Sequence, residues 1–88
     1  MKVSSYKPNQ TLVQTPGWTA LLSYDVPQVV VFHDNHARSK TVLVNNQRYS
    51  NTTSKHRKAF VRNLDENQYA ILDATPQEIQ AITGLETR

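Results

Sequence analysis

The stretch WTALLSYDVPQVVVFHD, residues 18–34, holds two different strand patterns back to back. Its first half has the two-residue period of a half-buried strand, with Trp18, Ala20, Leu22 and Tyr24 on one side. Its second half is a β-branched run bounded by turn residues, which is typical of a strand covered on both faces. Pro27 has no N–H to donate, so we expect it at the start of this strand or at a bulge. We expect Trp18, Tyr24 and Phe32 in the core.

Further strand patterns lie on both sides of this pair. TLVQT at residues 11–15 is a short extended segment that Pro16 and Gly17 end, and KTVLVNN at residues 40–46 follows the turn chemistry of DNHARS. The connections between these strands are short, which favours an antiparallel meander. QYAILDA, residues 68–74, is strand-like again.

The beginning of the chain is polar and contains Pro8 and Asn9. We therefore expect a flexible N-terminal arm over residues 1–10, followed by a single small domain over residues 11–88. The longest apolar run, VVVF, is far shorter than the ~20 residues of a membrane span, and the N-terminus has no apolar signal-peptide region. Cysteine is absent, which excludes disulfides and cysteine-type zinc sites. These features favour a soluble cytoplasmic protein, in the host cytoplasm if it is viral.

Two helices are predicted. TPQEIQAITGL, residues 75–85, has the start and stop signals of a helix: Thr75 as the N-cap, Pro76 at the first helical position, Glu78 three residues after the cap and Gly84 at the end. We expect Ile79, Ile82 and Leu85 to form its buried stripe. The other helix lies within YSNTTSKHRKAFVRN, residues 49–63, and extends to about Leu64. The order β-β-β-β-α-β-α predicts an α+β domain: a mostly antiparallel sheet of about four to five strands with two short helices packed on one face.

The first helix carries separate basic and apolar sides. At 100° per residue, Lys55, Lys58 and Arg62 fall within about a third of the circumference and form one basic ridge. Phe60, Val61 and Leu64 gather on the opposite side. Arg57 lies among the apolar positions, where its stem could pack while its head reaches water.

Charge is distributed unevenly along the chain. Between His36 and Leu64 there are seven Lys and Arg side chains and no Asp or Glu, whereas the remaining residues hold three basic and seven acidic side chains. This asymmetry suggests a basic surface that faces an anionic partner. The alternative is chance clustering on a solvated surface.

The start of the first helix is a candidate anion site. Thr52, Thr53 and Ser54 are possible N-caps, and free N–H groups, the helix dipole and Lys55 would all point at one anion. Cations near a helix N-terminus are slightly unfavourable for folding, which is an argument for an anion at this site. The alternative, an ordinary cap followed by a solvated basic face, stays open and has slightly more support. The candidate nucleic-acid or anion-binding residues are Arg48, Thr52, Thr53, Ser54, Lys55, Arg57, Lys58 and Arg62, with Tyr49 as a possible stacking platform.

A resemblance covers roughly residues 18–64. A YDTPV-like segment followed by YSxTTSKH or YSxTTSRH and a helix resembles small, mostly uncharacterised proteins of phages and other bacterial mobile elements. The resemblance carries no activity, but it implies a phage, prophage or plasmid context, in which small proteins commonly bind host or viral macromolecules. The matching residues are Tyr24, Asp25, Pro27, Val29, Tyr49, Ser50, Thr52, Thr53, Ser54, Lys55 and His56.

Other chemistries find little support in the sequence. His33, Asp34 and His36, with His56 from elsewhere, are valid ligand types, but a hairpin tip lacks the spacing of a metal site, so none is expected. The chain has two glycines and no nucleophile elbow, and the adjacent Asp65 and Glu66 are expected in a loop. We therefore expect no catalytic residues and no cofactor.

The leading hypothesis is a non-enzymatic binding protein whose basic surface engages nucleic acid or a nucleoprotein complex. An alternative is a protein–protein inhibitor of a host defence system, in the manner of anti-CRISPR proteins. A third is a virion component that oligomerises through its sheet edge.

Overall fold

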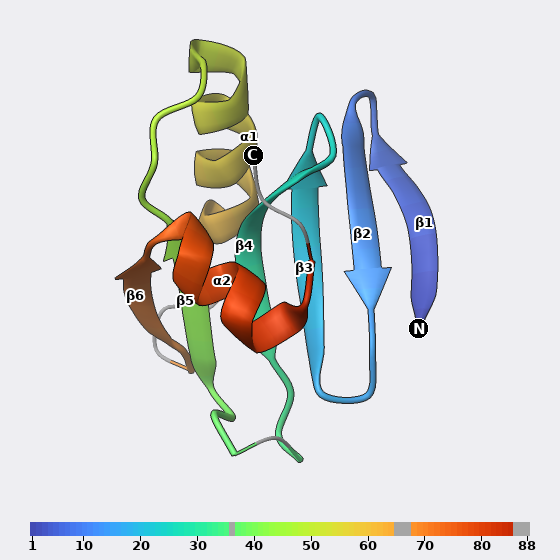
Figure 1. Ribbon diagram of the computed structural model, residues 1–88, viewed down its shortest axis with the longest axis vertical. Helices are drawn as coiled ribbons and strands as arrows, with labels where there is room; N and C mark the ends of the chain where they lie inside the picture. Colours follow the sequence, from blue (N-terminus) through green and yellow to red (C-terminus); the bar gives the residue numbers. More distant parts are fainter. Residues whose placement is uncertain (36, 65–67, 86–88) are drawn as a thin grey trace.

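The computed structural model describes residues 1–35, 37–64 and 68–85. Within these ranges, six strands form one sheet in the order β1-β2-β3-β4-β5-β6, so each strand lies beside its neighbour in sequence (Figure 1). The strands from β1 to β5 pair antiparallel, whereas β5 and β6 pair parallel and are joined by α1. The elements are β1 (Lys2–Lys7), β2 (Gln10–Gln14), β3 (Trp18–Ser23), β4 (Val26–Phe32), β5 (Thr41–Asn45), α1 (Asn51–Arg62), β6 (Ala70–Ala74) and α2 (Pro76–Thr83).

The central strand β4 is buried along its whole length, which confirms the prediction of a strand covered on both faces. Leu21 pairs with Val29 and Leu22 pairs with Pro27, so Gln28 is the extra residue of a β-bulge. Pro27 therefore lies beside the bulge near the start of the strand, as expected for a residue without an N–H donor.

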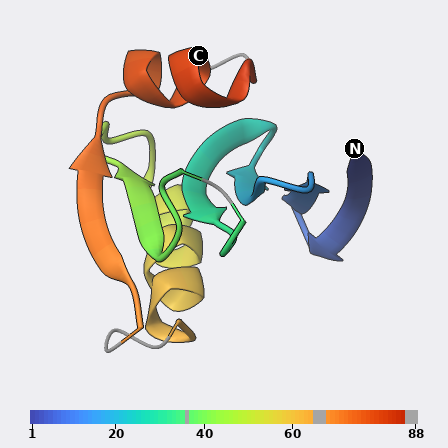
Figure 2. The same ribbon diagram turned by 90° about the horizontal axis from the view of Figure 1, so that it is seen from below.

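The helices cover opposite faces of the sheet (Figure 2), so the prediction that both pack on one face is wrong. Successive β4 side chains alternate between faces: Val30 and Phe32 join the cluster that α2 covers, whereas Val29 and Val31 join the cluster that α1 covers. A strand that is apolar on both sides needs cover on both sides, and one helical layer supplies only one.

The sheet has more strands than the predicted four to five, because residues expected as an N-terminal arm form β1. β1 pairs with β2 along its length and is largely exposed. The Tyr6 ring contacts Phe60 of α1 edge to face, with centroids 5.9 Å apart. The α+β class with two helices is confirmed, and the parallel β5–β6 pair makes the sheet mixed.

The β3–β4 turn corrects the predicted core. Tyr24 and Asp25 connect the paired residues Ser23 and Val26, with φ values of 50° and 65°, as in a type I′ turn. Tyr24 was expected in the core but is 50% exposed at this turn, because the strand ends one residue before it. Trp18 and Phe32 are buried as predicted.

The start and stop signals of α2 are confirmed. The Thr75 hydroxyl accepts from the Glu78 N–H, Glu78 closes the capping box, and Gly84 ends the helix in the left-handed region at φ 73°. Ile79 is fully buried, and Ile82 and Leu85 pack beside it. In the described part of the chain, neither helix has the length and apolarity that would let it cross a membrane.

Candidate functional site

The N-terminus of α1 is capped by Ser50, and not by Thr52, Thr53 or Ser54 as the sequence suggested. Ser50 has an extended backbone, so its Oγ accepts from the Thr53 N–H at 3.1 Å while its carbonyl accepts from the Ser54 N–H at 3.0 Å. Thr52 is exposed and Ser54 is half-buried, both inside the first turn.

The hydroxyl groups of this turn connect the helix to the sheet. Thr53 is 4% exposed, and its Oγ1 accepts from the Ser50 hydroxyl and lies 3.2 Å from the Ser23 Oγ of β3. The Ser23 Oγ is also 2.9 Å from the His56 Nδ1, and the His56 ring stacks on Tyr24 with centroids 6.1 Å apart. These hydrogen bonds leave the Thr53 hydroxyl facing the protein interior, where it cannot meet an external anion.

Arg57 turns inward. Its Nη1 donates to the Gln28 Oε1 at 3.1 Å, to the Asn45 carbonyl at 2.5 Å and to the Gln47 carbonyl at 3.2 Å. Gln28 and Asn45 are fully buried, so the guanidinium satisfies acceptors that water does not reach. The expectation that the Arg57 head reaches water is therefore only partly met, since the side chain is half-buried and holds the bulge of β4 to the end of β5.

Asn45 extends this polar layer to the candidate stacking residue. Its Nδ2 donates to the Pro27 carbonyl at 2.9 Å and to the Tyr49 hydroxyl at 3.2 Å, and its Oδ1 accepts from the Gln47 N–H at 2.9 Å. Tyr49 is half-buried and is tied by its hydroxyl to the sheet. We define the polar layer as Gln28, Asn45, Tyr49 and Arg57.

The basic ridge faces solvent, as the helical wheel predicted. Lys55, Lys58 and Arg62 are all exposed, and no acidic residue lies in the first turn of α1. None of the three side chains makes a hydrogen bond or an ion pair with another residue that the structure describes. Arg48 is exposed in the connection before the helix, where its Nη2 lies 3.5 Å from the Asn51 Oδ1.

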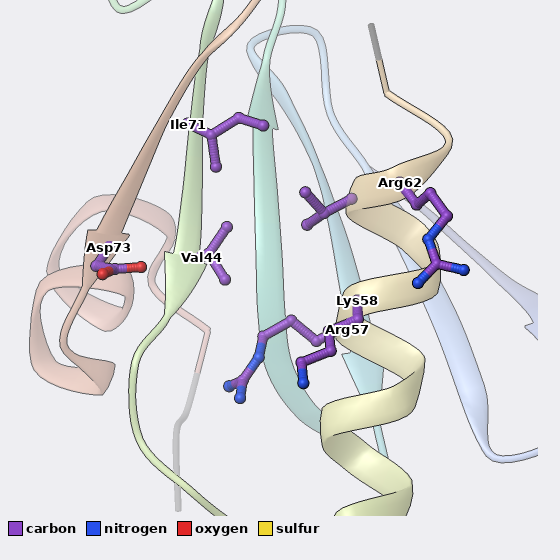
Figure 3. A pocket seen from close by; sticks show the side chains of 7 residues that line it. Val44, Arg57, Lys58, Arg62, Ile71 and Asp73 are labelled. Carbon is purple, nitrogen blue, oxygen red and sulfur yellow. The ribbon is translucent and has the colours of Figure 1, made fainter. Parts of the chain in front are cut away.

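A groove of about 430 Å³ runs between α1 and the β5–β6 edge of the sheet (Figure 3). Its α1 side carries three cations, its β6 side carries one carboxylate, and aliphatic side chains lie between them. The lining residues are Arg57, Lys58, Arg62, Asp73, Val44, Val61 and Ile71. No sequence pattern predicted this groove, although the alternation of Ile71 and Asp73 in QYAILDA put both residues on one face of β6.

The histidines do not come together. The His33 Nε2 lies 2.9 Å from the Thr19 Oγ1 near the start of β3, whereas His56 contacts Ser23 at the other end of that strand. His36 lies outside the described residues, as do Asp65 and Glu66. Among the residues that the structure describes, no group of three His, Asp or Glu side chains is placed to hold a metal ion.

The fold and the site define a class of protein: a small α+β domain with one helix on each face of a mixed sheet. One of the two helices, α1, carries an exposed basic ridge. The chain belongs to a family of unknown function, DUF8033, whose model matches residues 1–79. That match includes the polar layer, the basic ridge and the groove. No curated protein and no solved structure matches the chain.

Proposed function

We propose that the protein is a non-enzymatic binding protein whose basic ridge engages the phosphates of nucleic acid. The observation that carries the proposal is the exposure of Lys55, Lys58 and Arg62 on one side of α1, without a partner among the described residues. The ridge spans seven residue steps, about 10 Å along the helix. That length is about the axial rise of three nucleotides in one strand.

Folding does not account for the ridge. Lys58 and Arg62 are four residues apart on the helix, where like charges cost a few tenths of a kcal/mol, and Lys55 lies near the positive end of the helix dipole. An anionic ligand would turn both unfavourable terms into favourable ones. Arg48 and Thr52 are exposed beside the start of α1 and would extend the contact to a neighbouring phosphate.

Two residues from the predicted set are left out of the phosphate-contacting group. The Arg57 Nη1 already donates to three acceptors of the chain, and Thr53 is buried against β3. The contacts that remain are made mainly by Lys and Arg to a uniform backbone, so the binding is expected to be salt-sensitive and weakly specific for sequence.

The test is fluorescence anisotropy with labelled single- and double-stranded probes in a salt titration. The three phosphate contacts of the ridge alone give a slope of log affinity on log salt of about −2 for single strands and about −3 for duplex, and a fourth contact from Arg48 makes each slope steeper by about 1. Lys58→Glu with Arg62→Glu should abolish binding. The control variant, Lys2→Glu with Lys7→Glu, makes the same change in net charge on the exposed strand β1. It should retain most of the binding affinity.

Failure to bind either probe at low salt would refute the proposal. An equal loss in the control pair would show attraction to net charge and not to the ridge. A stoichiometric protein complex recovered from a nuclease-treated lysate, with no binding to the probes, would favour the inhibitor hypothesis.

A further inference from the structure

The groove beside the basic ridge exists because α1 does not cover the whole face of the sheet. α1 packs mainly against β3 and β4, so the β5–β6 edge is left partly open on that face. Val44, Val61 and Ile71 belong to the apolar cluster under α1, yet each is only half-buried. Aliphatic surface therefore remains accessible at the bottom of the groove (Figure 3).

The two walls of the groove differ in charge. Lys58 and Arg62 stand on the α1 wall, and Asp73 stands on the β6 wall. No ion pair joins Asp73 to a cation among the described residues, so the carboxylate and the cations are held apart across the groove. A ligand that complements both walls carries an anion on one side, a flat apolar body in the middle and hydrogen-bond donors on the other side.

We propose that this groove takes an unpaired base of a single-stranded nucleic acid, an inference that rests on the proposed function. The flanking phosphates contact Lys58 and Arg62, and the ring lies against Val61 and Ile71. The Asp73 carboxylate accepts from the exocyclic amino group of cytosine or adenine, as carboxylates accept from the cytosine N4 group.

This arrangement selects single strands over duplex. In a duplex the bases are stacked and paired, so none can enter the groove without the cost of unstacking, whereas a single strand can turn a base outward. It also selects among bases, because thymine has no exocyclic amino group and its N3–H lies between two carbonyl oxygens that repel a carboxylate. A fatty-acid-like anion would meet the cations and the aliphatic floor but would leave Asp73 without a donor.

The experiment compares labelled oligo(dC), oligo(dT) and a duplex of equal length by anisotropy at low salt. Oligo(dC) is expected to bind about fivefold more tightly than oligo(dT) and more tightly than duplex. Asp73→Ala should remove the difference between oligo(dC) and oligo(dT) without lowering the affinity for oligo(dT), since it deletes a negative charge. Asp34→Ala, which removes another exposed carboxylate, should preserve the difference.

The outcomes separate this inference from the proposed function. Equal affinity for the two oligonucleotides, an unchanged ratio in Asp73→Ala, or duplex binding as tight as single-strand binding would overturn the groove inference. In those cases the salt dependence and the loss in the Lys58→Glu, Arg62→Glu variant would still support the ridge. Absence of binding to all three probes would refute both. A labelled peptide of alternating Glu and Leu offers anions and apolar side chains but no base. If this peptide binds more tightly than oligo(dC), the groove inference is also overturned.

Discussion

Replacing Arg57 with methionine should destabilise the fold far more than replacing any residue of the basic ridge. Methionine keeps most of the apolar stem but removes the donor that serves Gln28 Oε1 and the Asn45 carbonyl, both in fully buried residues. A buried acceptor left without a partner costs about 1–3 kcal/mol, so two give a loss of about 2–4 kcal/mol after relaxation. The total stability expected for a chain of this length is about 4–13 kcal/mol.

A second substitution identifies the cause. In Gln28→Met with Arg57→Met, the buried amide and its donor are removed together, and an apolar pair of similar shape replaces them. The double variant is therefore expected to be more stable than Arg57→Met alone, which gives a coupling energy of about 1–2 kcal/mol between residues in direct contact.

Urea unfolding followed by the fluorescence of Trp18 measures these differences, because this buried side chain is the sole tryptophan of the chain. Lys58→Met is the matched control: it deletes a neighbouring cation that is exposed, and should change stability by less than about 0.5 kcal/mol. If Arg57→Met loses no more stability than Lys58→Met at an unchanged m-value, the structural role assigned to Arg57 is wrong.

Two further changes test the local structure around α1 and the β3–β4 turn. Ser50→Ala removes the acceptor of the Thr53 N–H, so it should lower the free energy of unfolding by about 1 kcal/mol and reduce the helix content measured by circular dichroism. The control Thr52→Ala, at an exposed position, should change the stability by less than about 0.5 kcal/mol. Equal effects of the two substitutions would contradict the assignment of Ser50 as the cap. Asp25→Gly should stabilise the fold by up to about 1 kcal/mol and raise Tm by several degrees, because glycine adopts the φ of 65° without strain. Asp25→Ala should instead lower Tm. A lower Tm for the glycine variant would contradict the type I′ turn.

Much of the fold follows from local patterns. The cap of α2, the burial of β4 and the place of Pro27 depend on a few neighbouring residues, and the structure confirms all three. The layer arrangement was not predictable in the same way. The parallel pairing of β5 with β6 and the placing of α1 and α2 on opposite faces depend on contacts between distant segments. The continuous apolar run in β4 was nevertheless a usable sign that two helical layers were needed.

In the candidate site, too, local features could be predicted from the sequence and contacts between distant segments could not. The exposure of the basic ridge follows from the helical period alone, so the sequence predicted it correctly. The inward turn of Arg57 could not be predicted from the helical period, because its partners Gln28 and Asn45 come from β4 and β5. Gln28 within an otherwise apolar run was a usable signal, since a buried amide needs a hydrogen-bond partner from elsewhere in the chain.

The segment YSNTTSKHRKAFVRN, residues 49–63, therefore contains two kinds of residue that must be tested differently. Ser50 caps the helix, and Thr53 and His56 bind it to Ser23 of β3, so substitution of any of the three is expected to weaken folding whether or not the protein binds an anion. A loss of nucleic-acid binding in such a variant is uninformative unless its unfolding midpoint matches that of the parent. Lys58 and Arg62 hold nothing together among the described residues, so loss of binding in their variants at unchanged stability would assign the ridge to the ligand.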